Sequence, residues 1–365
     1  MSNDYYVVSG DSLRDVADTI REKGGTSAQL EFPNGWMDAI DDIETDSGSV
    51  GNVWQDANGL IHLASEASGG DDVPDDGKTR IWIHIADGTP DNRLTFYLRF
   101  TASEANNTTV DWGDGTSETL GSTTATNYEH KYPSGGGDYV IVMTVNSGTI
   151  SFEGDSSNSI YGETAKRWNQ YRIYKIIFGS SVSALGEYVC NTCLSLKEVN
   201  VKSNLITKIS QHAFHYCAAL EKIILPNTVT EIETYAFNGC MIPQFQFPSN
   251  LETVGAYAFT GTRIETIDLP DTLTTLGQYN NNSNVVKIIV PYRITSISSY
   301  TFSNNISMSE YHFKPTTPPS LASTGIFSSI PSDCIIYVPQ GSLSAYQTAT
   351  NWSKFSSYMQ EEPQS

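Results

Sequence analysis

Histidine and cysteine carry the most specific chemistry in this chain, because imidazole and thiolate groups are the usual protein ligands of zinc. Of the six histidines, His212 and His215 flank Phe214 and stand close to Cys217. No histidine belongs to the H-E-x-x-H motif of zinc enzymes. His212 and His215 lie at the turn of a repeated unit, which places their side chains at a solvated corner. We therefore expect surface residues rather than metal ligands.

The five cysteines are an odd number, which excludes a complete disulfide framework. Cys193, Cys217 and Cys240 recur at one position of the repeated unit, three residues after its ring position. Cys190 takes a ring position itself, and Cys334 lies in the last predicted strand. We predict buried, reduced thiols. Since neighbouring strands lie about 4.8 Å apart, a zinc site or a disulfide stays open as the alternative.

Carboxylates are abundant but poorly organised for chemistry. Asp71, Asp72, Asp75 and Asp76 form a loose acidic run that does not match the D-x-[DN]-x-[DN]-G calcium loop, so we expect a solvated linker. Asp114 is predicted to hydrogen-bond its own turn, with cation binding as a minor alternative. No G-x-S-x-G, P-loop or G-x-G-x-x-G motif occurs. The sequence thus predicts no catalytic residues, no metal site, no cofactor and no enzymatic activity.

The net charge limits the partners. The 365 residues include 41 acidic and 21 basic ones, which gives a charge of −20. Phosphate backbones and anionic lipids repel such a chain, which argues against nucleic-acid binding. The chain contains no run of about 18 apolar residues, so the sequence does not predict membrane insertion. The first residues lack the basic and apolar regions of a secretory signal.

A repeat of roughly 22 residues, from about residue 174 to the C-terminus, must position most of these groups. The ring of Phe214 recurs at Phe237 and Phe259, is replaced at Asn281 and returns at Phe302. A unit this short cannot bury its apolar face alone, so the units must stack. We predict a solenoid over residues 173–365, whose long exposed surface favours binding over catalysis.

Each unit predicts one strand whose middle residue faces outwards, as in Ile223-Ile224-Leu225. These middle positions and the residues two before them form a candidate binding face. Its members are Lys175, Ile177, Asn200, Lys222, Ile224, Gln246, Thr266, Asp268, Lys287, Ile289, His312 and Tyr337. Exposed aliphatic residues in a row suggest contact with a partner. An ordinary sheet surface is the alternative.

The predicted fold class of the chain is mainly β with short helices. The part before the solenoid divides by composition into four segments. Residues 1–45 predict a small helical module whose apolar residues anchor it to another protein; these are Leu13, Val16, Ile20, Trp36 and Ile40. Residues 46–78 predict a short hairpin and an acidic linker. Residues 79–150 predict a β-sandwich, with strands at 81–85, 94–100, 110–115 and 138–145. Residues 151–172 predict a linker.

The repeats resemble the BspA-type leucine-rich repeat through the pattern I-x-x-x-A-F-x-x-C in Ile209–Cys217 and Ile232–Cys240. The segment Cys334–Trp352 is similar to the closing strand and helix of that family. The resemblance implies a solenoid of the kind found in bacterial surface proteins and phage-encoded proteins.

Two further resemblances concern the first half of the chain. The turn Trp112–Gly115, the His130-x-Tyr132 pattern and Tyr139 resemble the polycystic-kidney-disease (PKD) type of immunoglobulin-like domain, which implies a spacer or adhesion module. The order helix, REKGGTS, Phe-Pro turn and helix in residues 12–43 resembles the start of many phage tail and minor virion proteins.

Together these resemblances predict a phage virion protein, made in the host cytoplasm. Its N-terminal module would bind other virion proteins. Its sandwich and repeats would bind a host-surface protein or glycan. The alternative is a BspA-type adhesin at a bacterial cell surface. A glycan-processing enzyme would need a catalytic domain that the motifs do not show. A homo-oligomer stays open.

Overall fold

The computed structural model describes residues 53–55, 61–63, 76–154, 158–160, 162–163, 169–279 and 284–364. The chain divides into two compact units, Met1–Asp75 and Asp76–Ser365. In the first unit, strands β1 (Val53–Gln55) and β2 (Ile61–Leu63) pair antiparallel. The predicted anchor residues Leu13, Val16, Ile20, Trp36 and Ile40 lie outside the described residues, as do Asp71, Asp72, Asp75 and Asn281.

Alternating apolar residues build a β-sandwich at the start of the second unit. Ile81, Ile83 and Ile85 are buried, whereas His84 between them is exposed. The strands are β3 (Thr79–Ile85), β4 (Thr95–Ala102), β5 (Thr108–Asp111), β6 (Ser117–Leu120), β7 (Thr126–Lys131), β8 (Gly137–Val145) and β9 (Ile150–Phe152). The short 3-10 helix η1 (Asp91–Arg93) precedes β4, and β10 (Asn158–Ser159) pairs with β11 (Gly162–Glu163). The four strands expected here from the sequence are thereby confirmed.

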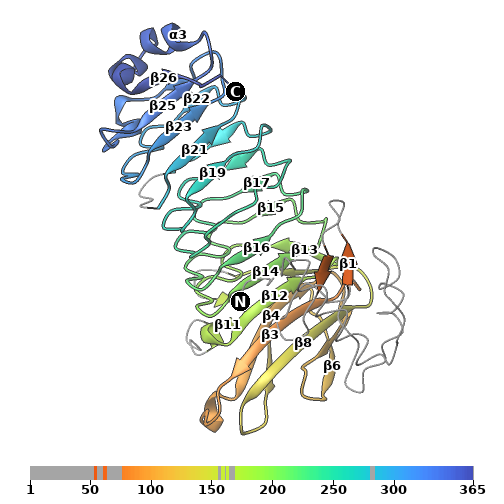
Figure 1. The fold of residues 1–365 in the computed structure, drawn as a ribbon. Helices are drawn as coiled ribbons and strands as arrows, with labels where there is room; N and C mark the ends of the chain where they lie inside the picture. Colours follow the sequence, from red (N-terminus) through yellow and green to blue (C-terminus); the bar gives the residue numbers. More distant parts are fainter. Residues whose placement is uncertain are drawn as a thin grey trace, which may run out of the picture. The chain divides into compact units, whose positions relative to one another are not determined.

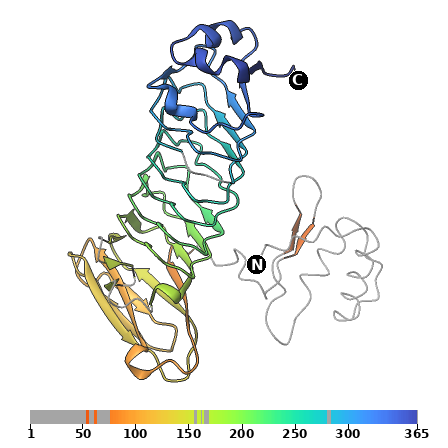
Figure 2. The same ribbon diagram turned by 90° about the vertical axis from the view of Figure 1, so that its left-hand side faces the viewer.

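The predicted solenoid is confirmed, and its coils stack along one axis (Figures 1 and 2). The first ladder of parallel strands contains β12 (Ile173–Phe178), β14 (Glu198–Val201), β16 (Lys222–Ile224), β19 (Thr266–Asp268), β21 (Lys287–Val290), β23 (Glu310–Phe313) and β25 (Ile335–Val338). The second ladder contains β13 (Val182–Leu185), β15 (Lys208–Ile209), β17 (Glu231–Ile232), β18 (Thr253–Val254), β20 (Thr275–Leu276), β22 (Ser296–Ile297) and β24 (Ser320–Leu321). The fold is mainly β, as predicted.

Both sheets of the sandwich continue into the solenoid. Strand β12 pairs parallel with β14 on one side and antiparallel with β3 on the other, which gives a sheet of order β16-β14-β12-β3-β8-β5-β6. Strand β13 pairs with β9, which in turn pairs with β4, in a second sheet of order β13-β9-β4-β7. The sandwich therefore covers the first edge of both ladders, which would otherwise expose unpaired backbone groups.

Stacked rings fill the solenoid core. The rings of Phe214 and Phe237 lie 5.4 Å apart with planes 5° from parallel, and Phe237 and Phe259 are also 5.4 Å apart. Tyr279 continues the stack: its ring is buried and lies 5.8 Å from that of Phe259. The coil that lacks the phenylalanine thus keeps an aromatic core residue.

The C-terminal segment closes the far end of the solenoid with 3-10 helices η3 (Thr324–Phe327) and η4 (Trp352–Tyr358), helix α3 (Leu343–Thr348) and strand β26 (Met359–Glu361). Strand β26 pairs parallel with β25. The Trp352 Nε1 donates to the Pro319 carbonyl at 2.7 Å, and the Tyr346 hydroxyl to the Pro315 carbonyl at 2.7 Å. The closing strand and helix expected from the family resemblance are confirmed.

Candidate functional site

The predicted binding face lies on the first ladder. Its residues fall into two sets, each of which belongs to one sheet and lies in register across that sheet's strands. In the first sheet, Lys175 lies opposite Glu198 and then Lys222, and Ile177 opposite Asn200 and then Ile224. In the sheet from β19 to β26, two rows cross the strands side by side. One row is Thr266, Lys287, Glu310 and Ile335; the other is Asp268, Ile289, His312, Tyr337 and Gln360. The residues of each row therefore lie on the same face of their sheet.

Three members of the face are buried rather than exposed. Lys175, Ile177 and Asn200 keep only 6%, 1% and 8% of their accessible surface. For Lys175 and Ile177 the reason is β3, whose Trp82 lies opposite Lys175 and whose Arg80 lies opposite Ile177. The Lys175 ammonium is 5.3 Å from the Trp82 ring centre and 3.1 Å from a Glu198 oxygen. This end of the ladder is an internal junction and offers no surface to a partner.

Gln246 also departs from the expectation, because it lies in no strand of the structure. The segment around it carries no ladder pairing, so the first ladder is divided between β16 and β19. Phe245 and Phe247 beside it pack against the core, and each forms an edge-on contact with the Phe259 ring. Ile224, 38% exposed, and Gln246 therefore border a gap in the ladder rather than continue one surface.

The accessible part of the face is the sheet from β19 to β26. Thr266 and Asp268 are exposed, and Lys287, Ile289, His312 and Tyr337 are partly exposed. The Lys287 ammonium lies 3.1 Å from a carboxylate oxygen of Glu310. The His312 and Tyr337 rings stack with centres 4.7 Å apart. This surface combines ionic, aliphatic and aromatic groups, which suits recognition of a polar partner better than covalent chemistry.

His312 is held between two carboxylates that sequence reasoning missed. Its Nδ1 lies 2.7 Å from an oxygen of Glu362 and its Nε2 3.0 Å from an oxygen of Glu310. The hydrogen bonds from His312 and Lys287 lower the pKa of the Glu310 carboxyl. Glu362 reaches the site because β26 returns alongside β25. The repeat pattern could not show this contact, because Glu362 follows the closing helices α3 and η4 rather than a repeated strand.

The two histidines of the solenoid corner are not simple surface residues, contrary to expectation. The His212 ring stacks between those of Tyr188, at 4.7 Å, and Tyr235, at 5.0 Å, and Tyr257 extends the column by another 5.0 Å. Burial lowers the pKa of His212. Burial, with the neighbouring His212, lowers the pKa of His215 to about 4. Both rings are therefore neutral packing elements at neutral pH.

Asp114 serves the turn that contains it, as predicted. Its Oδ1 accepts hydrogen bonds from the backbone and hydroxyl of Thr116 at 3.1 and 2.6 Å. Its Oδ2 lies 2.7 Å from Nε2 of His130, whose ring stacks 4.7 Å from that of Trp112. Although burial opposes ionisation, the bonds from Thr116 and His130 lower the pKa of Asp114. Both carboxylate oxygens have protein partners.

The five cysteines are free and buried, which confirms the predicted thiol stack. The Cys217 sulfur donates to the carbonyl of Cys190, and the Cys240 sulfur to the carbonyl of Phe214, each at 3.0 Å. Each bond links one coil to the one before it. Burial raises the pKa of Cys190, Cys193 and Cys240, and raises that of Cys334 to about 12. These thiols are structural groups.

Within the described ranges, no three histidine, cysteine, aspartate or glutamate side chains gather in a way that suits a metal ion. The same part of the chain contains no helix with the length and apolar character needed to cross a membrane.

Residues 149–220 and 207–320 match the BspA type leucine rich repeat region, in six copies. The solenoid contains BspA-type leucine-rich repeats. The match begins at residue 149, just before β9 of the sandwich, which pairs with the first strand of the second ladder. No curated protein matches this chain.

Solved structures of leucine-rich repeat proteins match part of this chain. The repeat protein of T. pallidum has 19% identity and a TM-score of 0.42, over 50% of this chain and 84% of that one. A repeat protein from Bacteroides ovatus has 17% identity and a TM-score of 0.36, over 47% and 62%. A leucine rich cell surface protein from Faecalibacterium prausnitzii has 14% identity and a TM-score of 0.24, over 59% and 91%.

Proposed function

We propose that this protein is a non-enzymatic adhesin of a bacterial cell surface, and that a protein or glycan docks on its sheet from β19 to β26. Two observations support the proposal: the chain contains six copies of the BspA-type repeat, and the sheet from β19 to β26 has a partly exposed, chemically mixed face. Repeats of this type are typical of adhesin-like surface proteins. The repeat match favours the cell-surface alternative over the virion assignment.

A phage virion protein is the second candidate. It rests on the resemblance of residues 12–43 to the start of phage tail proteins, which lies outside the described residues. The PKD-type resemblance of the sandwich fits either candidate, because such domains act as spacers or adhesion modules. In the virion proposal the N-terminal module binds other virion proteins.

Localisation distinguishes the two candidates. An antibody against the solenoid should label intact producing cells, and the chain should fractionate with the cell envelope. Lysates made with and without prophage induction provide the control. Recovery of the chain in purified particles, at a constant ratio to a tail protein, would replace the adhesin proposal with the virion one.

The docking face is tested by a pair of matched double variants. Ile289→Asp/Tyr337→Asp introduces charge at two partly exposed positions of the sheet from β19 to β26. We expect at least a tenfold loss of affinity, because carboxylates would have to be desolvated in the interface. The measurement is binding to arrayed glycans and extracellular-matrix proteins.

The control, Thr275→Asp/Ser296→Asp, places the same charges on exposed positions of the second ladder. It should retain the affinity of the parent chain. Circular dichroism should show both variants folded. If the first pair binds as tightly as the parent, the docking face lies elsewhere.

A further inference from the structure

One tyrosine of the solenoid is exposed in the turn between β15 and β16. Tyr216 keeps 52% of its accessible surface, and its φ of 54° is a left-handed conformation that favours glycine. The next two coils place Gly239 and Gly261 at this position, with φ of 74° and 78°. Core packing does not account for a large ring at a strained position where it stays exposed.

The neighbours of Tyr216 fix the position of its ring. A Cβ atom at Gly239 would lie 2.6 Å from Cδ1 and 2.9 Å from Cε1 of Tyr216, so a glycine is needed there to make room for the ring. The His215 ring lies on another side, with its centre 4.3 Å from that of Tyr216 and its plane at 61°. These contacts hold the ring in place while half of its surface faces solvent.

Two polar side chains beside the ring have hydrogen-bonding capacity to spare. Asn191, His215 and Asn238 take one position in three successive coils, and Nδ1 of His215 lies 3.2 Å from Oδ1 of Asn191. Among the residues that the structure describes, Nε2 of His215 and the partly exposed side-chain amide of Asn238 have no hydrogen-bond partner. Both groups are available to a ligand that lies on Tyr216.

The coils around Tyr216 contribute an uncharged region to a chain whose net charge is −20. Residues 188–196, 211–220 and 234–243 include no aspartate, glutamate, lysine or arginine. Burial and the neighbouring His212 lower the pKa of His215 to about 4, so its ring is neutral at neutral pH. The charged residues that adjoin these segments in sequence are Glu187, Lys197, Glu221 and Glu233. An aromatic ring with a neutral polar margin suits an uncharged, hydroxyl-rich ligand.

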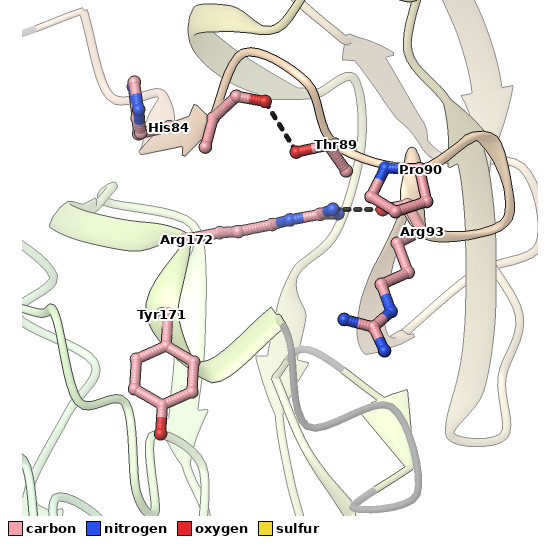
Figure 3. A pocket seen from close by; sticks show the side chains of 7 residues that line it. His84, Thr89, Pro90, Arg93, Tyr171 and Arg172 are labelled. Atoms are coloured by element: carbon pink, nitrogen blue, oxygen red, sulfur yellow. Dashed lines mark hydrogen bonds between the residues drawn. The ribbon is translucent and has the colours of Figure 1, made fainter.

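Two other exposed tyrosines lie beside charged groups. Tyr171, 57% exposed, lines a shallow hollow between the sandwich and the first coil, which the Arg172 side chain crosses (Figure 3). That guanidinium donates to backbone carbonyls of the sandwich, so the hollow is a junction closed by protein groups. Tyr292, 60% exposed, lies under the Lys314 ammonium, 5.7 Å from the ring centre. Neither ring has the uncharged margin of Tyr216.

We propose that Tyr216 binds a neutral pyranose sugar. The C–H face of the sugar lies on the tyrosine ring, whose π face carries partial negative charge, and sugar hydroxyls bond Nε2 of His215 and the amide of Asn238. A pyranose is about as wide as one aromatic ring. A protein interface would surround its aromatic residue with more apolar surface. The site shares no residue with the sheet from β19 to β26, so it goes beyond the proposed docking face, and failure at one leaves the other unaffected.

Saturation-transfer NMR of the full chain tests the proposal with the methyl glycosides of glucose, galactose, mannose and N-acetylglucosamine. A site open to water binds weakly, so we expect a dissociation constant on the order of 1–10 mM for at least one of the four. Transfer should be strongest to the C–H protons of one sugar face. No transfer to any of the four sugars would overturn the proposal.

Matched variants locate the binding. Tyr216→Gly removes the ring and should fold as the parent does in circular dichroism, because the next two coils have glycine at this position. We expect roughly tenfold weaker sugar binding from the lost ring contact. Asn238→Ala should weaken binding by roughly fivefold, the equivalent of one hydrogen bond.

The controls Tyr171→Ala and Tyr292→Ala remove equally exposed rings and should bind the sugar as the parent does. Parent-like binding by Tyr216→Gly, or an equal loss in either control, would refute the site. If no sugar binds but Tyr216→Gly loses affinity for an extracellular-matrix protein, the ring belongs to a protein interface and the sugar proposal is overturned.

Discussion

At the residue scale, the clearest arrangement is the imidazole of His312 between Glu310 and Glu362. Both ring nitrogens lie within hydrogen-bond distance of a carboxylate oxygen. Lys287 adds an ammonium group next to Glu310. The network ties β21, β23 and the returning strand β26 together across the candidate face. It makes this part of the surface both charged and fixed in geometry.

The variant Glu310→Gln tests this network through pH. The folded-state pKa of Glu310 lies below its ordinary value of 4.5, so its contribution is present above pH 4.5 and is lost as the pH falls through the folded-state pKa. Because the side chain is 37% exposed, we expect the variant to lose only roughly 0.2–1 kcal/mol at pH 7. The difference should disappear at low pH. Chemical denaturation from pH 3 to 7 measures it.

The exposed carboxylate of Glu252, beside β18, provides the control. Glu252→Gln should leave the unfolding free energy almost unchanged across the same pH range. A parallel pH profile for Glu310→Gln and the parent would show that His312 and Lys287 do not stabilise the ionised carboxylate.

The same site shows what single residues in the sequence can and cannot predict. Period-two alternation placed His312 and Tyr337 on one face, because a strand repeats its side-chain direction every second residue. It could not place Glu362, whose partner lies 50 residues earlier and is reached only when the tail pairs with β25. Asp114 was predictable because its hydrogen bonds to Thr116 are local.

At the element scale, the coil repeat fixes the core more firmly than the surface. The recurring ring and thiol positions are predictable because each coil repeats the contacts of the one before it. The aromatic column at the corner of the coils was not predictable from the repeat. Its residues Tyr188, His212, Tyr235 and Tyr257 have φ of 56°, 57°, 59° and 59°, a left-handed conformation that favours glycine. Nothing local in an aromatic residue signals that conformation, and ring stacking between coils offsets its cost.

Thiol reactivity reports how often the coils open. All five thiols are buried, and burial raises the pKa of those at Cys190, Cys193, Cys240 and Cys334. Since the thiolate is the nucleophile, we expect the native chain not to react with a disulfide reagent at pH 8 within minutes. All five should react in guanidinium chloride.

A positive control is Thr275→Cys, which adds one exposed thiol on β20 and should react at once. Fast reaction of any native cysteine would mean that its coil opens locally, at a free energy well below that of global unfolding. The stacked-coil description would then fail at that coil.

At the scale of the second unit, the sandwich and the solenoid share both of their sheets. The repeat could not predict this, because the residues that β3 covers at Lys175 and Ile177 look like any other outward positions. A solenoid needs its terminal coils covered, and here an antiparallel sandwich covers one end while the C-terminal helices cover the other (Figure 1). The arrangement explains why the accessible part of the first ladder lies towards the C-terminus.

Truncation tests whether the sandwich stabilises the solenoid. A chain that begins at Ile173 loses β3 and β9, and so exposes the β12 and β13 edges and the buried side chain of Ile177. We expect the loss of roughly 3 kcal/mol or more, which lowers the melting temperature by roughly 6–12 °C, and association through the free edges. A chain that begins at Asp76 keeps both pairings and should melt as the full chain does. Calorimetry and size-exclusion chromatography measure the two effects. If the chain from Ile173 is monomeric and melts with the chain from Asp76, the shared sheets contribute little, and the sandwich serves presentation rather than stability.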